Sequence, residues 1–106
     1  MRRGTTPTIV INVTGEDFFE STLYVTLEQG EFELTKTGED VAVTPTDNGA
    51  TVEIFLSQEE TLAFTNGSAR IQIRWIDSGG NAQASPIKAI EISPILLDGV
   101  ITYDGD

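Results

Sequence analysis

In Thr51-Val-Glu-Ile-Phe-Leu-Ser-Gln-Glu-Glu-Thr-Leu-Ala-Phe64, the pattern of a β-strand gives way to that of a short helix. The first half of this segment alternates apolar and other residues with the period of two that is typical of a half-buried strand. Ser57 and Glu60 then have the spacing of a capping box, in which the serine hydroxyl bonds the third backbone N–H of the helix and the glutamate reaches back to the cap. The segment therefore predicts a strand followed by one helical turn.

A second strand is predicted directly after this turn. Asn66 and Gly67 are able to adopt the left-handed backbone that ends a helix. In Ala69–Trp75, isoleucine and tryptophan then alternate with arginine and glutamine, so one face of the strand is apolar. We therefore place Trp75 in the core in preference to an exposed sugar-binding platform.

The rest of the chain repeats the period-two pattern between turn signals rich in glycine, aspartate and asparagine. Ser85 and Pro86 interrupt the last such segment, and because proline cannot donate to a ladder, we expect a bulge or a sheet edge there, with a change of register. About seven short strands with one helical turn predict an all-β fold, an immunoglobulin-like antiparallel β-sandwich. Besides the two strands above, we expect strands at Thr8–Val13, Ser21–Gln29, Glu31–Lys36, Val41–Val43 and Ala82–Ile92.

The 106 residues are expected to form a single domain, residues 1–106, because this length can bury a core without staples and no linker divides it. Residues 1–7 are predicted to be a short, mobile N-terminal arm. The C-terminal tail, residues 94–106, is irregular but carries aliphatic side chains that need a cover. Either it folds back on its own sandwich as a final strand or hook, or it forms a patch that docks into a partner.

The composition excludes several kinds of chemistry. With no histidine and no cysteine, the chain lacks the commonest general base, thiolate nucleophiles and the usual zinc ligands. Glu59 and Glu60 are adjacent on a helical turn, so they make a poor carboxylate pair for glycoside hydrolysis. Calcium is an alternative for Asp77–Asn81, Asp47–Gly49 and Asp104–Asp106, but tight turns favour the same residues. We predict no enzymatic activity, no catalytic residues, no metal and no cofactor.

Acidic residues outnumber basic ones by 17 to 6, which gives a net charge of −11. This charge opposes binding to nucleic acid or to an anionic membrane surface, and no apolar run is long enough to cross a bilayer. The basic residues are unevenly placed. Arg2 and Arg3 lie in the arm, whereas Arg70 and Arg74 share one face of a predicted strand, where they either balance nearby carboxylates or meet an acidic neighbour.

Several motifs spread over most of the chain: Met1-Arg-Arg-Gly-Thr-Thr-Pro-Thr8, Leu56-Ser-Gln-Glu-Glu-Thr-Leu-Ala-Phe64, Ile71-Gln-Ile-Arg-Trp-Ile-Asp77, Ala84-Ser85 and Leu97-Asp-Gly-Val100. In these motifs the chain resembles small proteins encoded among the structural genes of phages and prophages of Gram-positive bacteria. The middle pattern is also similar to the N-terminal domain of phage baseplate upper proteins, in which a strand, an acidic Glu-Glu-Thr turn and a glycine precede a strand and a polar hairpin.

The resemblance implies a non-enzymatic virion structural protein, a β-sandwich docking module assembled in the cytoplasm of the bacterial host. Its partners would be phage structural proteins or copies of itself, in a homo-oligomer or lattice with a decoration or baseplate-type role, in head or tail. Deletion of Met1–Thr6 or Ile95–Ile101 is expected to abolish incorporation and leave the domain folded. A host-glycan-binding module of the phage particle is the alternative, and a small enzyme using carboxylates alone is a third. The predicted partner contacts are Arg2, Arg3, Arg70, Arg74, Ile95, Leu96, Leu97, Val100 and Ile101.

Overall fold

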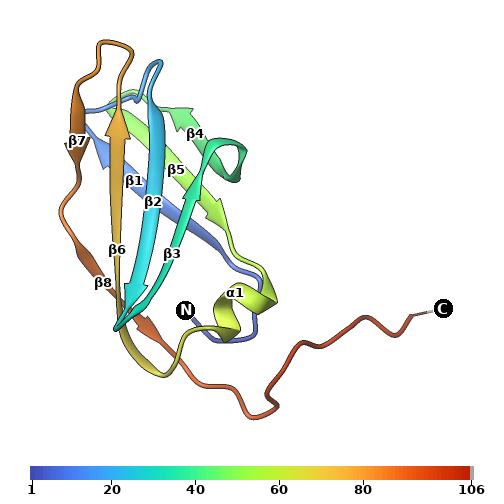
Figure 1. The fold of residues 1–106 in the computed structure, drawn as a ribbon. Helices are drawn as coiled ribbons and strands as arrows, with labels where there is room; N and C mark the ends of the chain where they lie inside the picture. Colours follow the sequence, from blue (N-terminus) through green and yellow to red (C-terminus); the bar gives the residue numbers. More distant parts are fainter. Residues whose placement is uncertain (106) are drawn as a thin grey trace.

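A computed structural model describes residues 1–105 and shows two antiparallel sheets packed face to face (Figure 1). Asp106, the last residue of the predicted tail and of the Asp104–Asp106 calcium alternative, lies outside the described residues. The elements follow one another as β1 (Thr8–Thr14), β2 (Thr22–Gln29), β3 (Phe32–Thr37), a 3₁₀ turn (Gly38–Asp40), β4 (Val41–Pro45), β5 (Gly49–Phe55), α1 (Gln58–Leu62), β6 (Gly67–Ile76), β7 (Ala82–Ala84) and β8 (Lys88–Ile92).

Three strands form one sheet and five form the other. The first sheet has the order β1-β5-β4, and the second has the order β3-β2-β6, with β7 and β8 both pairing along the far side of β6. In the lettering of the immunoglobulin fold these are B-E-D and C′-C-F-G, with β7 and β8 together in the place of strand G. The predicted all-β sandwich is confirmed.

The core lies between the sheets because alternate residues of each strand point inward. Trp75 is partly buried at the margin of this core, where its ring packs edge-on against Phe18 with centroids 5.1 Å apart. The tryptophan therefore belongs to the core, as its position on the apolar face of β6 predicted. The buried apolar side chains are Phe18, Leu23, Val25, Leu27, Ala50, Val52, Ile54, Leu56, Phe64, Ala69, Ile71, Ile73 and Ile92.

Helix α1 begins at the predicted capping box. The Ser57 hydroxyl accepts a hydrogen bond from the Glu60 N–H at 3.2 Å, and the Glu60 carboxylate accepts one from the Ser57 N–H at 2.8 Å. The helix ends at Leu62, so Asn66 and Gly67 do not end it as the sequence suggested. Gly67 instead begins β6, where its φ of 121° favours glycine.

Glu60 also joins the helical turn to the second sheet. Its carboxylate oxygens lie 2.8 and 2.7 Å from Nζ of Lys36 on β3, and both side chains are mostly buried. Burial by itself raises the pKa of Glu60, but the hydrogen bonds from Lys36 and Ser57, together with the charge of Lys36, outweigh it and hold the pKa below the ordinary value of 4.5. One carboxylate thus caps α1 and ties it to β3.

The low pKa of Glu60 predicts a loss of stability in acid. Because the folded state binds this proton less readily than the unfolded state, Glu60 stabilises the fold above its ordinary pKa, and the contribution is lost as pH falls through the lowered, folded-state pKa. Urea unfolding between about pH 6 and 3 should therefore show a smaller acid-induced loss for Glu60→Gln than for the unmodified chain. Glu59→Gln, at an exposed neighbouring position, should behave like the unmodified chain; equal acid profiles for all three would contradict the assignment.

The predicted Ala82–Ile92 strand is divided in two at Ser85 and Pro86. Trp75 pairs with Gln83 in β7, whereas Ala69 pairs with Ile90 in β8, so the register shifts by one residue between them. Ser85 takes up the extra residue, because its N–H donates to the Ile73 carbonyl at 2.8 Å and its hydroxyl accepts from the Ile73 N–H at 3.0 Å. This is the bulge that the proline predicted.

Candidate interaction surfaces

The N-terminal arm is fixed to the sandwich, which differs from the mobile arm that the sequence suggested. Arg2 forms a parallel bridge with Ser93, just beyond β8. Arg3 donates from Nε to the Phe64 carbonyl at 2.5 Å and from Nη2 to the Leu62 carbonyl at 2.9 Å. Only 20% of the Arg3 side chain is exposed. Arg3 therefore satisfies carbonyls at the end of α1 and is a structural residue, whereas Arg2 is exposed.

Replacement of Arg3 by alanine is expected to lower the free energy of unfolding by about 2 kcal/mol, because it leaves two partly buried carbonyls without their charged donor. Arg2→Ala is the matched control: it removes one exposed bond to the Pro94 carbonyl and should cost less than about 1 kcal/mol. Urea denaturation of the two variants measures the difference. Equal losses would show that Arg3 does not anchor the arm. For the same reason, deletion of residues 1–6 should destabilise the domain, in contrast to the expectation from sequence.

Arg70 and Arg74 lie on the outer face of β6, as predicted, but in different surroundings. Arg70 binds Glu28 of β2, with Nε 3.0 Å from the carboxylate oxygen, and both side chains are substantially exposed. An exposed pair of this kind contributes at most about 1 kcal/mol. Arg74 lies opposite Tyr24 on β2, and within residues 1–105 it forms no ion pair. Arg70 is thus engaged with its own chain, and Arg74 is open to a partner.

The tail leaves the sandwich after β8 and runs outward past α1 (Figure 1). The hydrogen bonds between the side chain of Gln58 and the backbone of Ile101, both 2.9 Å, hold it on this side of the molecule. Within the described residues the tail forms no strand, so it is not the last strand of its own sandwich. Ile95 is partly buried beside Gly4. The other predicted tail contacts are exposed: Leu96 by 107%, Leu97 by 72%, Val100 by 49% and Ile101 by 59%.

The Asp77–Asn81 loop is a closed turn. One oxygen of the Asp77 carboxylate accepts from the backbone N–H groups of Gly79 and Asn81, each at 3.0 Å. The bond from the Asn81 backbone, with further bonds from the Asn81 side chain and from Gly79, lowers the pKa of Asp77 despite slight desolvation. Within residues 1–105 no group of three or more acidic side chains is placed to hold a metal ion together. The turn interpretation of this loop accounts for its aspartate.

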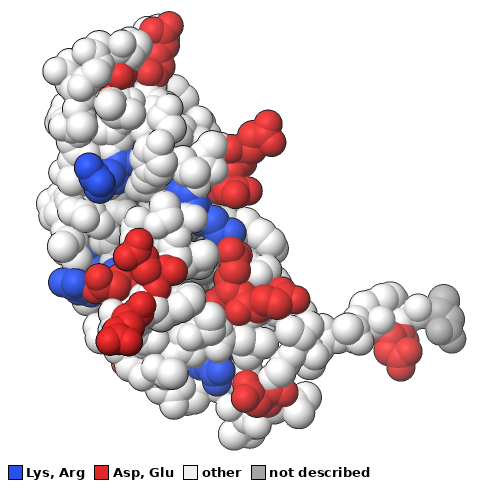
Figure 2. Space-filling model, viewed as in Figure 1, with Lys and Arg blue, Asp and Glu red and all other residues white. Residues whose placement is uncertain are grey.

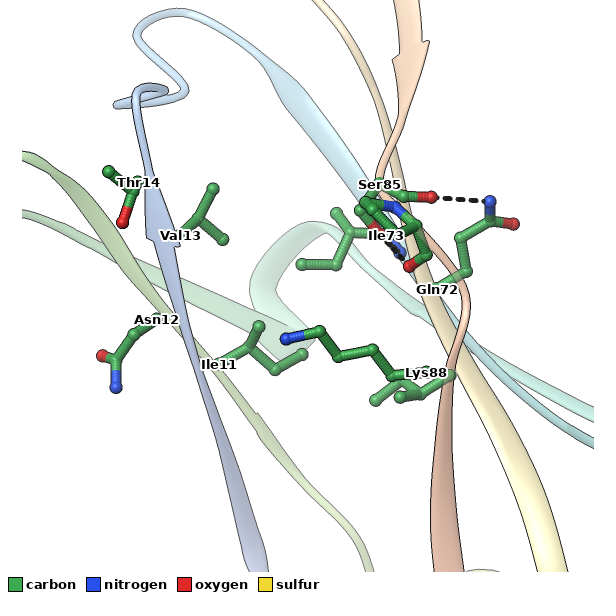
Figure 3. Close-up of a pocket in the computed structure, with 10 residues that line it drawn as sticks. Ile11, Asn12, Val13, Thr14, Gln72, Ile73, Ser85 and Lys88 are labelled. Atoms are coloured by element: carbon green, nitrogen blue, oxygen red, sulfur yellow. Dashed lines mark hydrogen bonds between the residues drawn. The ribbon is translucent and has the colours of Figure 1, made fainter.

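A groove that the sequence analysis missed opens between the two sheets, on the side of β1 (Figure 3). Its volume is about 280 Å³, and Figure 3 shows Ile11 and Val13 on one side, Ile73 on the other, and the Lys88 side chain extending toward β1. The bulge at Ser85 lies at its rim. One sequence signal was present: Thr8–Thr14 contains neither charge nor proline. The groove is lined by Ile11, Asn12, Val13, Thr14, Ile71, Gln72, Ile73, Ser85, Pro86 and Lys88.

Acidic side chains dominate among the charged groups of the chain, in keeping with the net charge of −11. On the face drawn in Figure 2, acidic side chains outnumber basic ones and gather over its lower half, while the basic ones form small separate patches. Lys36 and Arg70 are already paired with carboxylates of their own chain. Basic groups left for a partner are therefore few, and Lys88 at the groove is one of them.

The fold and these surfaces define an immunoglobulin-type β-sandwich with an open groove on one side and a projecting apolar tail on the other. Comparison with protein-family models, with curated proteins and with solved structures finds no match to this chain. No helix within residues 1–105 combines the length and the apolar character that crossing a membrane requires.

Proposed function

We propose that this protein is a structural docking module of a phage virion, which assembles with copies of itself or with capsid or tail proteins and carries out no catalysis. The observation that carries the proposal is the tail, which holds four aliphatic side chains and Tyr103 out in solvent. Contiguous apolar surface of this kind is typical of a protein contact site. The resemblance to structural-gene products of phages gives the setting in which such contacts are made.

The architecture suits assembly in many copies. A rigid sandwich with one projecting segment makes a small contact per subunit, and neighbours in a ring or shell raise the effective concentration for one another. The tail is held at its middle by Gln58 but leaves its apolar side chains free, so little of their surface has to be uncovered before docking. Affinity then comes from the number of contacts and from their geometry.

The test is to count this chain in particles purified from the bacterium that encodes it, by quantitative mass spectrometry against the major shell protein. A ratio near one indicates head decoration, and a few copies per particle indicate tail, neck or baseplate. A chain with Leu97→Asp and Ile101→Asp, both at exposed positions, should stay folded and be lost from particles. Absence of the unmodified chain from particles would overturn the virion assignment.

A second candidate function, recognition of a host glycan, is favoured by one feature of the outer face of the second sheet. Tyr24 is 42% exposed and lies directly across from Arg74, beside a hollow of about 260 Å³. An exposed ring next to a polar group is the usual way to stack a sugar. Binding on a glycan array that disappears with Tyr24→Ala, but not with Phe19→Ala at another exposed aromatic, would support this role.

A further inference from the structure

Resting on the proposed assembly function, we propose that the tail of one copy docks on a second copy, as an added strand along the free edge of β1 and over the groove. The contact joins two different surfaces, so it links copies head to tail and produces open chains or closed rings. Addition of a strand to an exposed sheet edge is a general mode of recognition, in which the backbone provides affinity and side chains provide register.

The edge of β1 is a vacant strand position. In the immunoglobulin fold, strand A pairs with strand B, but here β1 occupies place B and, within residues 1–105, pairs with β5 alone. Leu56 N–H donates to the Pro7 carbonyl and Gly15 N–H donates to the Asn48 carbonyl. Because paired and unpaired positions alternate in an antiparallel ladder, the backbone groups of β1 directed away from β5 are those of Thr8, Val10, Asn12 and Thr14.

This edge also lacks the usual protection. Exposed edge strands are normally kept from pairing by charges, prolines or short length. β1 has seven residues, Thr-Ile-Val-Ile-Asn-Val-Thr, and none of them is charged or proline. Each of the other edges is interrupted: β3 by Glu33 and Lys36, β4 by Pro45, β7 by its length of three residues, and β8 by Lys88 and Glu91. An unprotected edge is expected to have an occupant.

The groove beside this edge takes the side chains of an added strand. Its inner surface is apolar, formed by Ile11 and Val13 of β1 and by Ile71 and Ile73 of β6. Ile11 and Val13 are only partly buried although they face the core, because no strand in the described part of the chain covers them on this side. A strand laid along β1 would place every second side chain over these residues.

The tail has the matching length and pattern. Leu97–Tyr103 is as long as β1, about 23 Å when extended. In that conformation Leu97, Ile101 and Tyr103 share one face, with Gly99 between them. The other face carries Leu96, Asp98, Val100 and Thr102. The first face presents only apolar and aromatic side chains to the groove, and its three large side chains are all exposed in the present structure.

The tail that docks in the groove belongs to a second copy, because each tail lies beside α1 and away from the groove of its own sandwich. It passes α1 and is held there by Gln58, whereas the groove opens between β1 and β8 (Figure 1, Figure 3). Charge fits the same arrangement. Lys88 extends over the groove and forms no ion pair within residues 1–105, and the tail carries Asp104, whereas Asp98 already lies 3.5 Å from Nη2 of Arg3 in its own chain. Apart from this local match, copies with a net charge of −11 repel one another, so moderate salt should favour association.

Sedimentation of the full chain over a range of concentrations tests the proposal. The unmodified chain should form dimers and longer species. Leu97→Asp with Ile101→Asp should weaken association by more than about tenfold, because it places charges in the apolar groove. Leu96→Asp with Thr102→Asp adds the same charge on the opposite face and should associate like the unmodified chain.

A second set of variants changes the proposed docking edge itself, at Asn12 of β1. Asn12→Pro removes an N–H directed away from β5, and Asn12→Ala is its matched control, since both lose the bond from the Thr51 hydroxyl. The proline variant alone should stay monomeric and the alanine variant should associate. An equimolar mixture of Asn12→Pro with the Leu97→Asp, Ile101→Asp chain should form a heterodimer and nothing larger, because one intact tail and one intact groove remain. Thermal melts confirm that each variant is folded.

Four outcomes would overturn the inference. Association of the Asn12→Pro chain at the level of Asn12→Ala would show that β1 is not the docking edge, and absence of the mixed heterodimer would show that tail and groove do not meet. A chain that is monomeric at every concentration yet present in particles would rule out the head-to-tail contact but would agree with the proposed assembly function. A chain that neither self-associates nor enters particles would overturn both.

Discussion

Replacement of Phe64 by alanine is expected to lower the free energy of unfolding by about 3–5 kcal/mol. Phe64 is fully buried in the core, two residues after the end of α1, and its ring packs edge-on against Phe32 with centroids 4.9 Å apart. The truncation removes the buried apolar surface of the ring and leaves a cavity that the surrounding strands fill only in part. For a domain of this size the loss corresponds to a drop in Tm on the order of 15 °C or more.

The measurement is urea or thermal unfolding followed by circular dichroism. Phe55→Ala is the matched control, since Phe55 is 55% exposed at the end of β5 and its loss should cost less than about 1 kcal/mol. Similar losses for the two variants would contradict the position of Phe64 in the core.

Gly49→Ala is expected to cost about 3 kcal/mol or more. The glycine is buried at the start of β5, opposite Thr14 of β1, and a Cβ added there would lie within 1.9 Å of the Val13 carbonyl oxygen. The obstacle is backbone rather than a flexible side chain, so the ladder between β1 and β5 has to separate locally. Because the proposed docking edge is the other side of β1, the substitution should weaken self-association as well as the fold.

Gly79→Ala separates this effect from the general cost of adding a methyl group to a glycine. A Cβ at Gly79 would meet only side-chain atoms of Asn81 and Asp77, at 3.3 and 3.4 Å, and these are able to move. Its melting temperature should fall by a few degrees at most, on the order of the shift for 1 kcal/mol or less. A Gly49→Ala chain as stable as Gly79→Ala would mean that β1 and β5 are not held as closely as the structure shows.

The two proposals give the ends of the chain different roles. The arm packs against the end of the sandwich that carries α1, where Arg3 binds the Leu62 and Phe64 carbonyls. Changes in the arm should therefore act mainly on stability. The tail contributes little to the fold beyond Ile95, so changes at Leu97 and Ile101 should act on assembly alone. Stability and incorporation measured on the same variants will therefore separate the two ends.

The sequence by itself determined the elements of this fold. Period-two alternation gave the strands, the Ser57 and Glu60 spacing gave the start of α1, and Ser85-Pro86 gave the break between β7 and β8. These signals are local, because a strand face, a helix cap or a bulge depends on residues a few positions apart. The positions of Trp75 in the core and of Asp77 in a turn follow from the same short-range patterns.

Only the tertiary structure decided what the surfaces offer. The sequence predicted Arg3 to be a partner contact in a mobile arm. In the folded chain it binds the carbonyls of Leu62 and Phe64, which lie far along the sequence. The groove exists because β1 and β8, distant in sequence, border the same opening and none of the strands described in residues 1–105 lies between them. The exposure of the tail depends in the same way on Gln58 holding it beside α1. Such features arise from contacts between residues widely separated in sequence, and the local pattern of the chain carries no record of which distant segments meet.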